Sequence, residues 1–415
     1  MYKKPLLFAI ILLMMLISSC SILKRYNIPP KDNEQMLPNQ PKDNKPIEKI
    51  DPIQEQVDSM TIDEKIGQMV MASVEGYSLD ANGEDLINKY NVGGFIVLGE
   101  NVRDTEQLQA LVNSLKSANS KNKLPLFIST DEEGGRVSRM PDEFKDLPSN
   151  RSIGKTGSSE FALNIGKLIS EELISFGINM DFAPVLDINS NPKNTVIGDR
   201  SFGPDANIVA RLGTQEMKGM QSKNIISVVK HFPGHGDTSV DSHVGLPVIN
   251  NDADRLKGFE LVPFASAIEN NTDGIMIAHI LLPKIDSDNP ASMSKTIITD
   301  MLRDEMDFKG IVITDDMTMG AIVKNYNIGE AAVRSINAGS DIILVCHGFD
   351  NQVAVIDALR KAASDGRITQ KRIDESLYRI IKLKNKYMLA DKPSEPADVS
   401  NINQHIKSVL NSYMK

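Results

Sequence analysis

Short apolar runs alternate with amphipathic segments along the chain from residue 67 to residue 346. In the amphipathic segments apolar residues recur at spacings of three and four, as in Leu108, Leu111 and Leu115, which places them on one face of a helix. The apolar runs themselves are predicted to be strands. The eight predicted strands span residues 67–73, 92–98, 124–130, 178–187, 225–230, 274–281, 310–314 and 341–346.

Strands that are apolar along their whole length and alternate with helices indicate a parallel sheet that is buried on both faces. Eight such strand–helix units in roughly 340 residues favour a closed barrel of the α/β class. We therefore predict a single (β/α)8 TIM-like barrel over residues 51–392. A doubly wound open sheet is the alternative.

Local signals place the ends of some helices. Thr61 and Glu64 have the spacing of a capping box and are predicted to open the first helix of the folded region. Gly177 is predicted to end the helix that precedes the fourth strand. The tail, residues 393–415, is expected to be weakly helical and has no assigned role.

The N-terminal region has the pattern of an exported protein. Residues 1–19 carry two lysines and then an apolar run that is too short to span a bilayer, as in a signal peptide. The run leads through Ser18 and Ser19 to Cys20, which resembles a bacterial lipobox, so Cys20 is expected to be lipidated. The alternative is a plain signal peptide with an incidental cysteine.

Residues 20–50 are rich in Pro, Asn, Lys and Asp, and we expect them to be a flexible tether. The chain would then be exported and anchored to the cell membrane through its N-terminal lipid only. The one other cysteine is Cys346, so no internal disulfide is expected when Cys20 is lipidated.

Composition excludes several partners. The net charge is −9 with acids and bases interleaved, so the chain has no basic stripe of the kind that binds nucleic acid. No motif for a nicotinamide, a nucleotide or a metal is present. We expect a monomer that needs no cofactor.

Charged residues and glycines follow or interrupt four of the predicted strands. In a barrel the active site forms at the C-terminal ends of the strands, so these clusters are expected to converge on one face. They are residues 131–135 after the third strand, Lys230 and His231 after the fifth, His279 within the sixth, and Asp315 and Asp316 after the seventh.

Asp315 directly follows the seventh strand and is rigidly supported there, which suits a nucleophile. A retaining glycosidase needs such a carboxylate and a separate proton donor for the leaving oxygen. Asp316 is the competitor for the first role, but neighbouring residues on a strand point to opposite sides.

The proton donor need not be a carboxyl group. Asp241 and His243 are two residues apart, so in an extended loop both side chains lie on one side and the carboxylate can orient the imidazole. Such a histidine can give and then take a proton. In a competing interpretation His231, His235 and His243 bind a metal, although their spacing matches no common zinc motif.

Five ordered motifs resemble glycoside hydrolase family 3, and specifically its β-N-acetylhexosaminidase branch, which is typified by bacterial cell-wall recycling enzymes. The resemblance covers nearly the whole predicted barrel. The motifs occupy residues 131–139, 181–188, 200–203, 230–243 and 314–322.

The resemblance implies that Asp315 forms a glycosyl-enzyme intermediate and that Asp241 and His243 are the acid/base dyad. Asp181 and Asp187 are expected to be structural or to support the side chains that touch the sugar. The residues that the family implies for holding sugar hydroxyls are Asp131, Arg139, Arg200, Lys230 and His231.

Many relatives carry a second α/β domain after the barrel, whereas only a short stretch follows Leu389 here. Family members that act on β-glucosides usually take the acid/base from that domain, so we expect a single-domain pocket that prefers N-acetylhexosamine. The leading hypothesis is an exo-acting retaining hydrolase that removes terminal N-acetyl-β-glucosamine from cell-wall fragments or chitooligosaccharides. The alternatives are a β-N-acetylglucosaminide phosphorylase and a non-catalytic glycan-binding lipoprotein.

Overall fold

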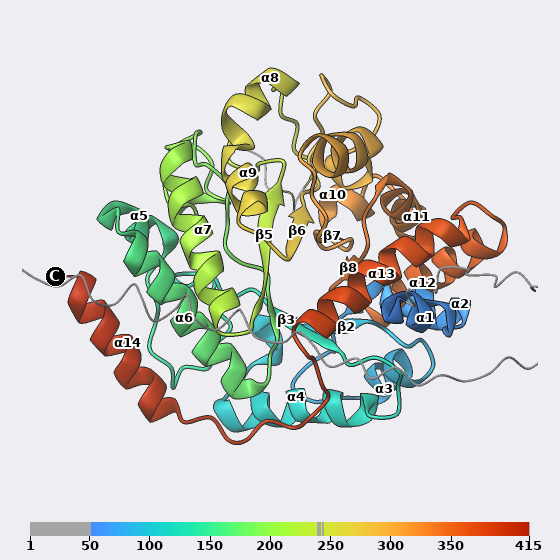
Figure 1. Ribbon diagram of the computed structural model, residues 1–415, viewed down its shortest axis with the longest axis horizontal. Helices are drawn as coiled ribbons and strands as arrows, with labels where there is room; N and C mark the ends of the chain where they lie inside the picture. Colours follow the sequence, from blue (N-terminus) through green and yellow to red (C-terminus); the bar gives the residue numbers. More distant parts are fainter. Residues whose placement is uncertain (1–50, 239–241, 243–244, 415) are drawn as a thin grey trace, which may run out of the picture. The chain divides into compact units, whose positions relative to one another are not determined.

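The strands form a closed parallel barrel (Figure 1). The computed structural model describes residues 51–238, 242 and 245–414. Each strand from β1 to β6 pairs with the next, β8 pairs with β1, and a parallel bridge from Ile313 to Ile342 joins β7 to the segment just before β8. The predicted barrel is confirmed and the open-sheet alternative is wrong. The strands are β1 (Val70–Ala72), β2 (Gly94–Val97), β3 (Phe127–Thr130), β4 (Met180–Asp181), β5 (Ile226–Phe232), β6 (Gly274–Ile277), β7 (Ile311–Thr314) and β8 (Ile343–Val345).

Helices follow the strands and surround the barrel (Figure 1). The α-helices are α1 (Pro52–Asp58), α2 (Ile62–Gln68), α3 (Ala81–Asn88), α4 (Thr105–Asn119), α5 (Asn150–Thr156), α6 (Ser159–Phe176), α7 (Ala206–Ser222), α8 (Ala253–Arg255), α9 (Val262–Glu269), α10 (Gly320–Val323), α11 (Ile328–Ala338), α12 (Phe349–Ser364), α13 (Gln370–Lys386) and α14 (Val399–Tyr413). The remaining helical segments are η1 (Gly99–Asn101), η2 (Gly198–Arg200), η3 (Leu256–Glu260), η4 (Ala291–Met293) and η5 (Thr296–Glu305).

The predicted helix ends are largely confirmed. Thr61 caps α2 through a reciprocal bond pair with Glu64, and Gly177 ends α6 with a φ of 77°. The helix at Thr61 is not the first of the folded region, however. Helix α1 precedes it, because Asp51 accepts hydrogen bonds from the first-turn N–H groups and Pro52 stands where no helical N–H bond is needed.

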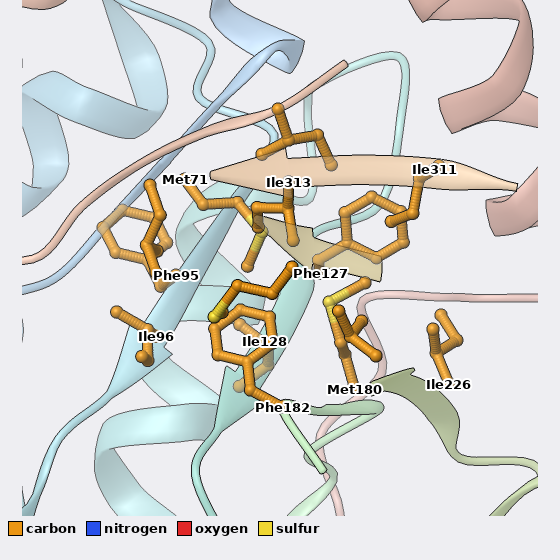
Figure 2. Close-up of a cluster of buried hydrophobic side chains, with 14 of the residues drawn as sticks. Met71, Phe95, Ile96, Phe127, Ile128, Met180, Phe182, Ile226, Ile311 and Ile313 are labelled. Atoms are coloured by element: carbon orange, nitrogen blue, oxygen red, sulfur yellow. The ribbon is translucent and has the colours of Figure 1, made fainter. Parts of the chain in front are cut away.

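Side chains from most of the strands fill the barrel. Every residue of the eight strands is buried, as expected for a parallel sheet that is covered by helices outside and by side chains inside. Figure 2 shows one apolar cluster that gathers side chains from β1, β2, β3, β4, β5 and β7. This packed interior fixes the ends of the strands, from which the polar side chains of the site extend.

The C-terminal tail packs against the barrel. It was expected to be weakly helical, and it contains the fifteen-residue helix α14, which lies along α6 (Figure 1). Ile402 and Ile406 are buried, and the Tyr413 ring stacks on Phe161 with centroids 4.8 Å apart. Within the described part of the chain, no helix combines the length and apolar character needed to cross a bilayer.

Candidate active site

One cavity of about 770 Å³ opens where the strands end. It is lined by residues from three of the four predicted charged clusters, at residues 131–135, 230–231 and 315–316, so the predicted convergence on the C-terminal face is confirmed for these three. Cys20, Asp241 and His243 lie outside the described residues, but Ser242, which stands between the last two in the sequence, lines the cavity. The predicted site residues that the structure describes all line it as well: Asp131, Arg139, Arg200, Lys230, His231 and Asp315.

Asp315 is held at the end of β7 as an ionised carboxylate. Its backbone N–H donates to the Ile277 carbonyl at 2.9 Å, and its Oδ1 accepts the N–H of Asp316 at 2.9 Å. Burial raises the pKa of Asp315, but the His231 and His279 rings, the Asp316 N–H and the charged Lys230 together lower it more, so the net pKa lies below the usual value. An ionised carboxylate beside a ligand-sized cavity meets the first requirement for a nucleophile.

The side chain of Asp316, in contrast, is fully engaged in hydrogen bonds with the protein. Its Oδ1 accepts the N–H groups of Thr318 and Cys346, each at 2.9 Å, and its Oδ2 accepts the Thr318 hydroxyl. These bonds tie the loop after β7 to the end of β8. Of the two neighbouring carboxylates, the geometry therefore favours Asp315 as the nucleophile.

The strand boundaries near the site differ slightly from the prediction. Lys230 and His231 lie inside β5 rather than after it, and His279 follows the end of β6 rather than lying within it. His279 is fully buried, with Nδ1 2.7 Å from the Ser292 hydroxyl and Nε2 3.0 Å from the Asp316 carbonyl. His279 thus contacts the loop after β7 through the Asp316 carbonyl, and it does not line the cavity.

Glu133 joins a buried lysine to a partly buried arginine. Both of its oxygens pair with the Arg200 guanidinium at 2.8 Å, and its Oε1 is 2.7 Å from Lys230 Nζ, which also contacts Asp131. Burial raises the pKa of Glu133, but Arg200 and Lys230 bring it well below the usual value. The pKa of Lys230 is raised, because Asp131 and Glu133 outweigh the effect of burial, which lowers it. Glu133 and Lys230 are therefore both charged at neutral pH.

The loop after β3 is folded around a second buried acid. Glu132 accepts the Arg139 N–H at 2.7 Å, the Ser138 hydroxyl at 2.8 Å and the Gly134 N–H at 3.3 Å. Gly134 has a φ of 71°, and a Cβ there would lie 2.7 Å from the Pro148 carbonyl oxygen, so glycine is required. Burial raises the pKa of Glu132 to about 7. Glu132 thus fixes the backbone that carries Arg139 to the cavity.

Asp187 accepts hydrogen bonds from two parts of the KHFPGH segment. Its Oδ2 lies 2.6 Å from His231 Nδ1, and its Oδ1 accepts the His235 N–H at 2.6 Å. Asp187 is fully buried, which raises its pKa, but His231 brings the pKa below the usual value. Sequence reasoning left Asp187 as structural or supporting and did not single out Glu133, since the partners of both lie more than forty positions away in the chain.

Among residues 51–238, 242 and 245–414, no group of three or more His, Cys, Asp and Glu side chains is arranged to hold a metal ion. The three-histidine interpretation also includes His243, which the structure does not describe. One of its other members, His231, has its Nδ1 atom occupied by Asp187.

The Glu133→Gln variant is expected to lose about 10²-fold in kcat/KM, because a neutral amide cannot hold Arg200 and Lys230 together and small displacements of binding groups are costly. The free energy of unfolding should fall by about 1–3 kcal/mol. Steady-state kinetics and urea unfolding measure both effects. Glu216→Gln is the matched control, since Glu216 is equally buried and its carboxyl has no hydrogen-bond partner within the described chain. Equal losses in both variants would refute the specific role of Glu133.

Several known proteins are similar to this chain in sequence or structure. Beta-hexosaminidase A of Pseudoalteromonas piscicida is 39% identical over 326 residues, which is 73% of this chain but only 54% of that protein's length. The beta-hexosaminidase of Tolumonas auensis is 36% identical over 294 residues, 70% of this chain and 86% of that protein. A solved glycoside hydrolase family 3 beta-N-acetylglucosaminidase from Paenibacillus sp. str. FPU-7 matches with a TM-score of 0.80 and 38% identity, covering 86% of this chain and 69% of that one.

The family model described as the glycosyl hydrolase family 3 N-terminal domain matches residues 61–383. This match begins at the cap of α2 and ends within α13, so it includes all eight strands and the loops that line the cavity. The resemblance seen in the five sequence motifs is confirmed: the chain belongs to glycosyl hydrolase family 3.

Proposed function

We propose that the chain is an exo-acting, retaining β-N-acetylhexosaminidase that removes terminal N-acetyl-β-glucosamine from the non-reducing end of glycans. The observation that carries the proposal is the pairing of one partly exposed carboxylate with a lowered pKa, Asp315, with a cluster of charged hydrogen-bonding groups in a single cavity. The names of the related proteins support the same activity.

In this mechanism an Asp315 oxygen attacks the anomeric carbon while the bond to the leaving oxygen breaks. The imidazolium of His243, oriented by Asp241, gives its proton to that oxygen. Water then attacks the anomeric carbon and gives a proton back to His243, and the Asp315 carboxylate is released. The dyad rests on its motif and on the presence of Ser242 in the cavity lining.

Recognition of the terminal sugar falls to the charged groups around Asp315. Arg139, Arg200 and Lys230 can only donate hydrogen bonds, whereas Asp131 accepts them, so together they match hydroxyls that do both. Lys230 and Arg200 are already neutralised by Glu133 and Asp131. A balanced cluster of this kind suits a neutral sugar.

The place of action is a further part of the proposal. Residues 1–20 have the pattern of a lipoprotein signal that ends at Cys20, and residues 20–50 that of a tether. We infer that the chain acts outside the cytoplasmic membrane, on cell-wall fragments or chitooligosaccharides. Peptidoglycan turnover would provide such substrates.

The deciding experiment compares kcat/KM of the chain from Ile50 onward for an aryl N-acetyl-β-glucosaminide and for the aryl β-glucoside. We expect the acetamido sugar to be preferred by about 10²-fold or more, as in sites that hydrogen-bond a group the competitor lacks. The assay is repeated in phosphate buffer with detection of sugar 1-phosphate. A preference for the glucoside would contradict the substrate assignment, and faster release of the 1-phosphate than of free sugar would establish the phosphorylase instead.

A further inference from the structure

The contacts of Asp187 link two parts of the site. It lies after β4, where the Val185–Lys230 bridge continues the pairing with β5. The Asp187 carboxylate forms two hydrogen bonds. Its Oδ2 lies 2.6 Å from His231 Nδ1, and its Oδ1 accepts the His235 N–H at 2.6 Å. His231 lines the cavity, and His235 stands near the start of the segment that leads to Asp241 and His243 in the sequence.

The charge of Asp187 decides which ring nitrogen of His231 carries the proton. An ionised carboxylate can only accept hydrogen bonds, so the Nδ1 atom that faces it must be protonated. The lowered pKa of Asp187 is consistent with ionisation at neutral pH. In the neutral ring, Nε2 is then an acceptor, and it has no hydrogen-bond partner among the residues that the structure describes.

An acceptor at this position complements the rest of the cluster. The nearby arginine and lysine groups can only donate hydrogen bonds. A sugar hydroxyl that accepts a bond from one of them therefore still needs an acceptor for its own O–H. Asp131 can accept one such proton, although its Oδ1 is already paired with Lys230. His231 Nε2 supplies another acceptor within the same cavity.

We propose that Asp187 is a positioning residue that holds His231 as the Nδ1–H tautomer, so that Nε2 accepts a hydrogen bond from one hydroxyl of the terminal sugar. Through the His235 N–H it also fixes the start of the segment that bears the predicted acid/base dyad. The inference rests on the proposed glycosidase function for its substrate, but not for the tautomer.

The test uses Asp187→Asn in the purified protein. The asparagine keeps an oxygen for the His235 N–H, while its amide group donates toward His231 Nδ1 and forces the proton onto Nε2. We expect kcat/KM to fall by about 10²-fold. Asp181→Asn is the matched control, because Asp181 is also fully buried, its Oδ2 has no hydrogen-bond partner within the described chain, and the amide oxygen of asparagine can keep the bond that Oδ1 accepts from the Glu132 N–H. It should change kcat/KM by less than about 3-fold.

Substrate analogues separate positioning from general damage. Aryl N-acetyl-β-glucosaminides that lack the 3-, 4- or 6-hydroxyl are compared in the wild type and in Asp187→Asn. The proposal requires that the cost of removing one particular hydroxyl nearly vanishes in the variant while the other two costs persist, as in a double-mutant cycle. A loss by the same factor for every analogue would overturn it.

A series of substrates with different aryl leaving groups tests whether His231 transfers a proton to the leaving oxygen. Equal losses in Asp187→Asn for aryl groups of high and low leaving ability support positioning. A loss that disappears with dinitrophenyl would make His231 the proton donor and would overturn the proposal.

Nitrogen-15 NMR of the histidine rings tests the tautomer without any assay of activity, with His231→Gln used for assignment. The expected result is a protonated Nδ1 in the wild type and a protonated Nε2 in Asp187→Asn. A wild-type ring protonated at Nε2, whether alone or together with Nδ1, overturns the proposal even if the enzyme is active. If the spectra are as expected but the protein is inactive on every aryl N-acetylhexosaminide, the proposed function is refuted. The role of Asp187 in setting the tautomer is then still supported.

Discussion

Replacing Asp315 by alanine is expected to lower kcat/KM for an aryl N-acetyl-β-glucosaminide by about 10⁴-fold or more, while the barrel stays folded. The carboxylate is the only group proposed to form a bond to the anomeric carbon, so no neighbouring side chain replaces it. Its one described side-chain bond is accepted from the N–H of Asp316, and the loop keeps its other contacts. Steady-state kinetics measures the loss, and the circular dichroism spectrum monitors the fold.

Added azide gives a second, qualitative result with this variant. Azide can occupy the space left by the carboxylate, attack the anomeric carbon from the same face and release the aryl group. The product is then the α-glycosyl azide, whereas loss of an acid/base group would give the β-azide. Formation of the β-azide, or near-normal activity in Asp315→Ala, would show that the nucleophile is another residue.

The barrel could be predicted because its strands are buried on both faces. Each run of Val, Ile, Leu and Phe in the sequence corresponds to one strand in the structure. Strand lengths were less well predicted. The fourth run, residues 178–187, contains only the two-residue strand β4 and then a single bridge at Val185. Apolar character reports burial, and the chain after β4 remains buried where it no longer forms a continuous ladder.

The site was predicted from two features, the position of charged residues at strand ends and the family motifs. What the sequence could not show are the ion pairs between residues that line the cavity. Glu133 is one of three consecutive acids, and nothing in its position distinguishes it from Glu132, yet it alone joins Arg200 to Lys230. Such pairings depend on the arrangement of strands around the barrel, which brings distant segments together.

Helix α14 in the C-terminal tail was also only partly predicted from the sequence. Its composition, with several Asn and Ser residues, gives a low intrinsic preference for helix. Helix α14 is nevertheless complete, because Ile402 and Ile406 pack against the barrel and His405 reaches Glu171 on α6. Tertiary contact, rather than local preference, accounts for this element.

Removal of Asp341 is expected to produce the largest loss of stability. This fully buried carboxylate lies just before β8 and accepts the Val312 N–H at 3.0 Å and Arg379 at 3.0 Å, and it also pairs with Arg303 and Arg372. In Asp341→Ala three guanidinium groups lose their shared counter-charge. Breaking a buried ion pair from one side costs about 3–5 kcal/mol, so the free energy of unfolding should fall by that amount in urea titrations.

The stabilisation that Asp341 provides is expected to depend on pH. Burial raises the pKa of Asp341, but its arginine partners lower it to about 2 in the folded state, below the unfolded value of about 4. The contribution is therefore fully present above about pH 4 and is lost as the pH falls towards 2. Asp341→Ala should remove this part of the acid sensitivity, while Asp365→Asn, which weakens an exposed pair with Arg367 and keeps an oxygen for the Arg367 N–H, should change little. If both variants unfold like the wild type, the arginines are held by other contacts and Asp341 does not stabilise the junction of β7, β8 and α13.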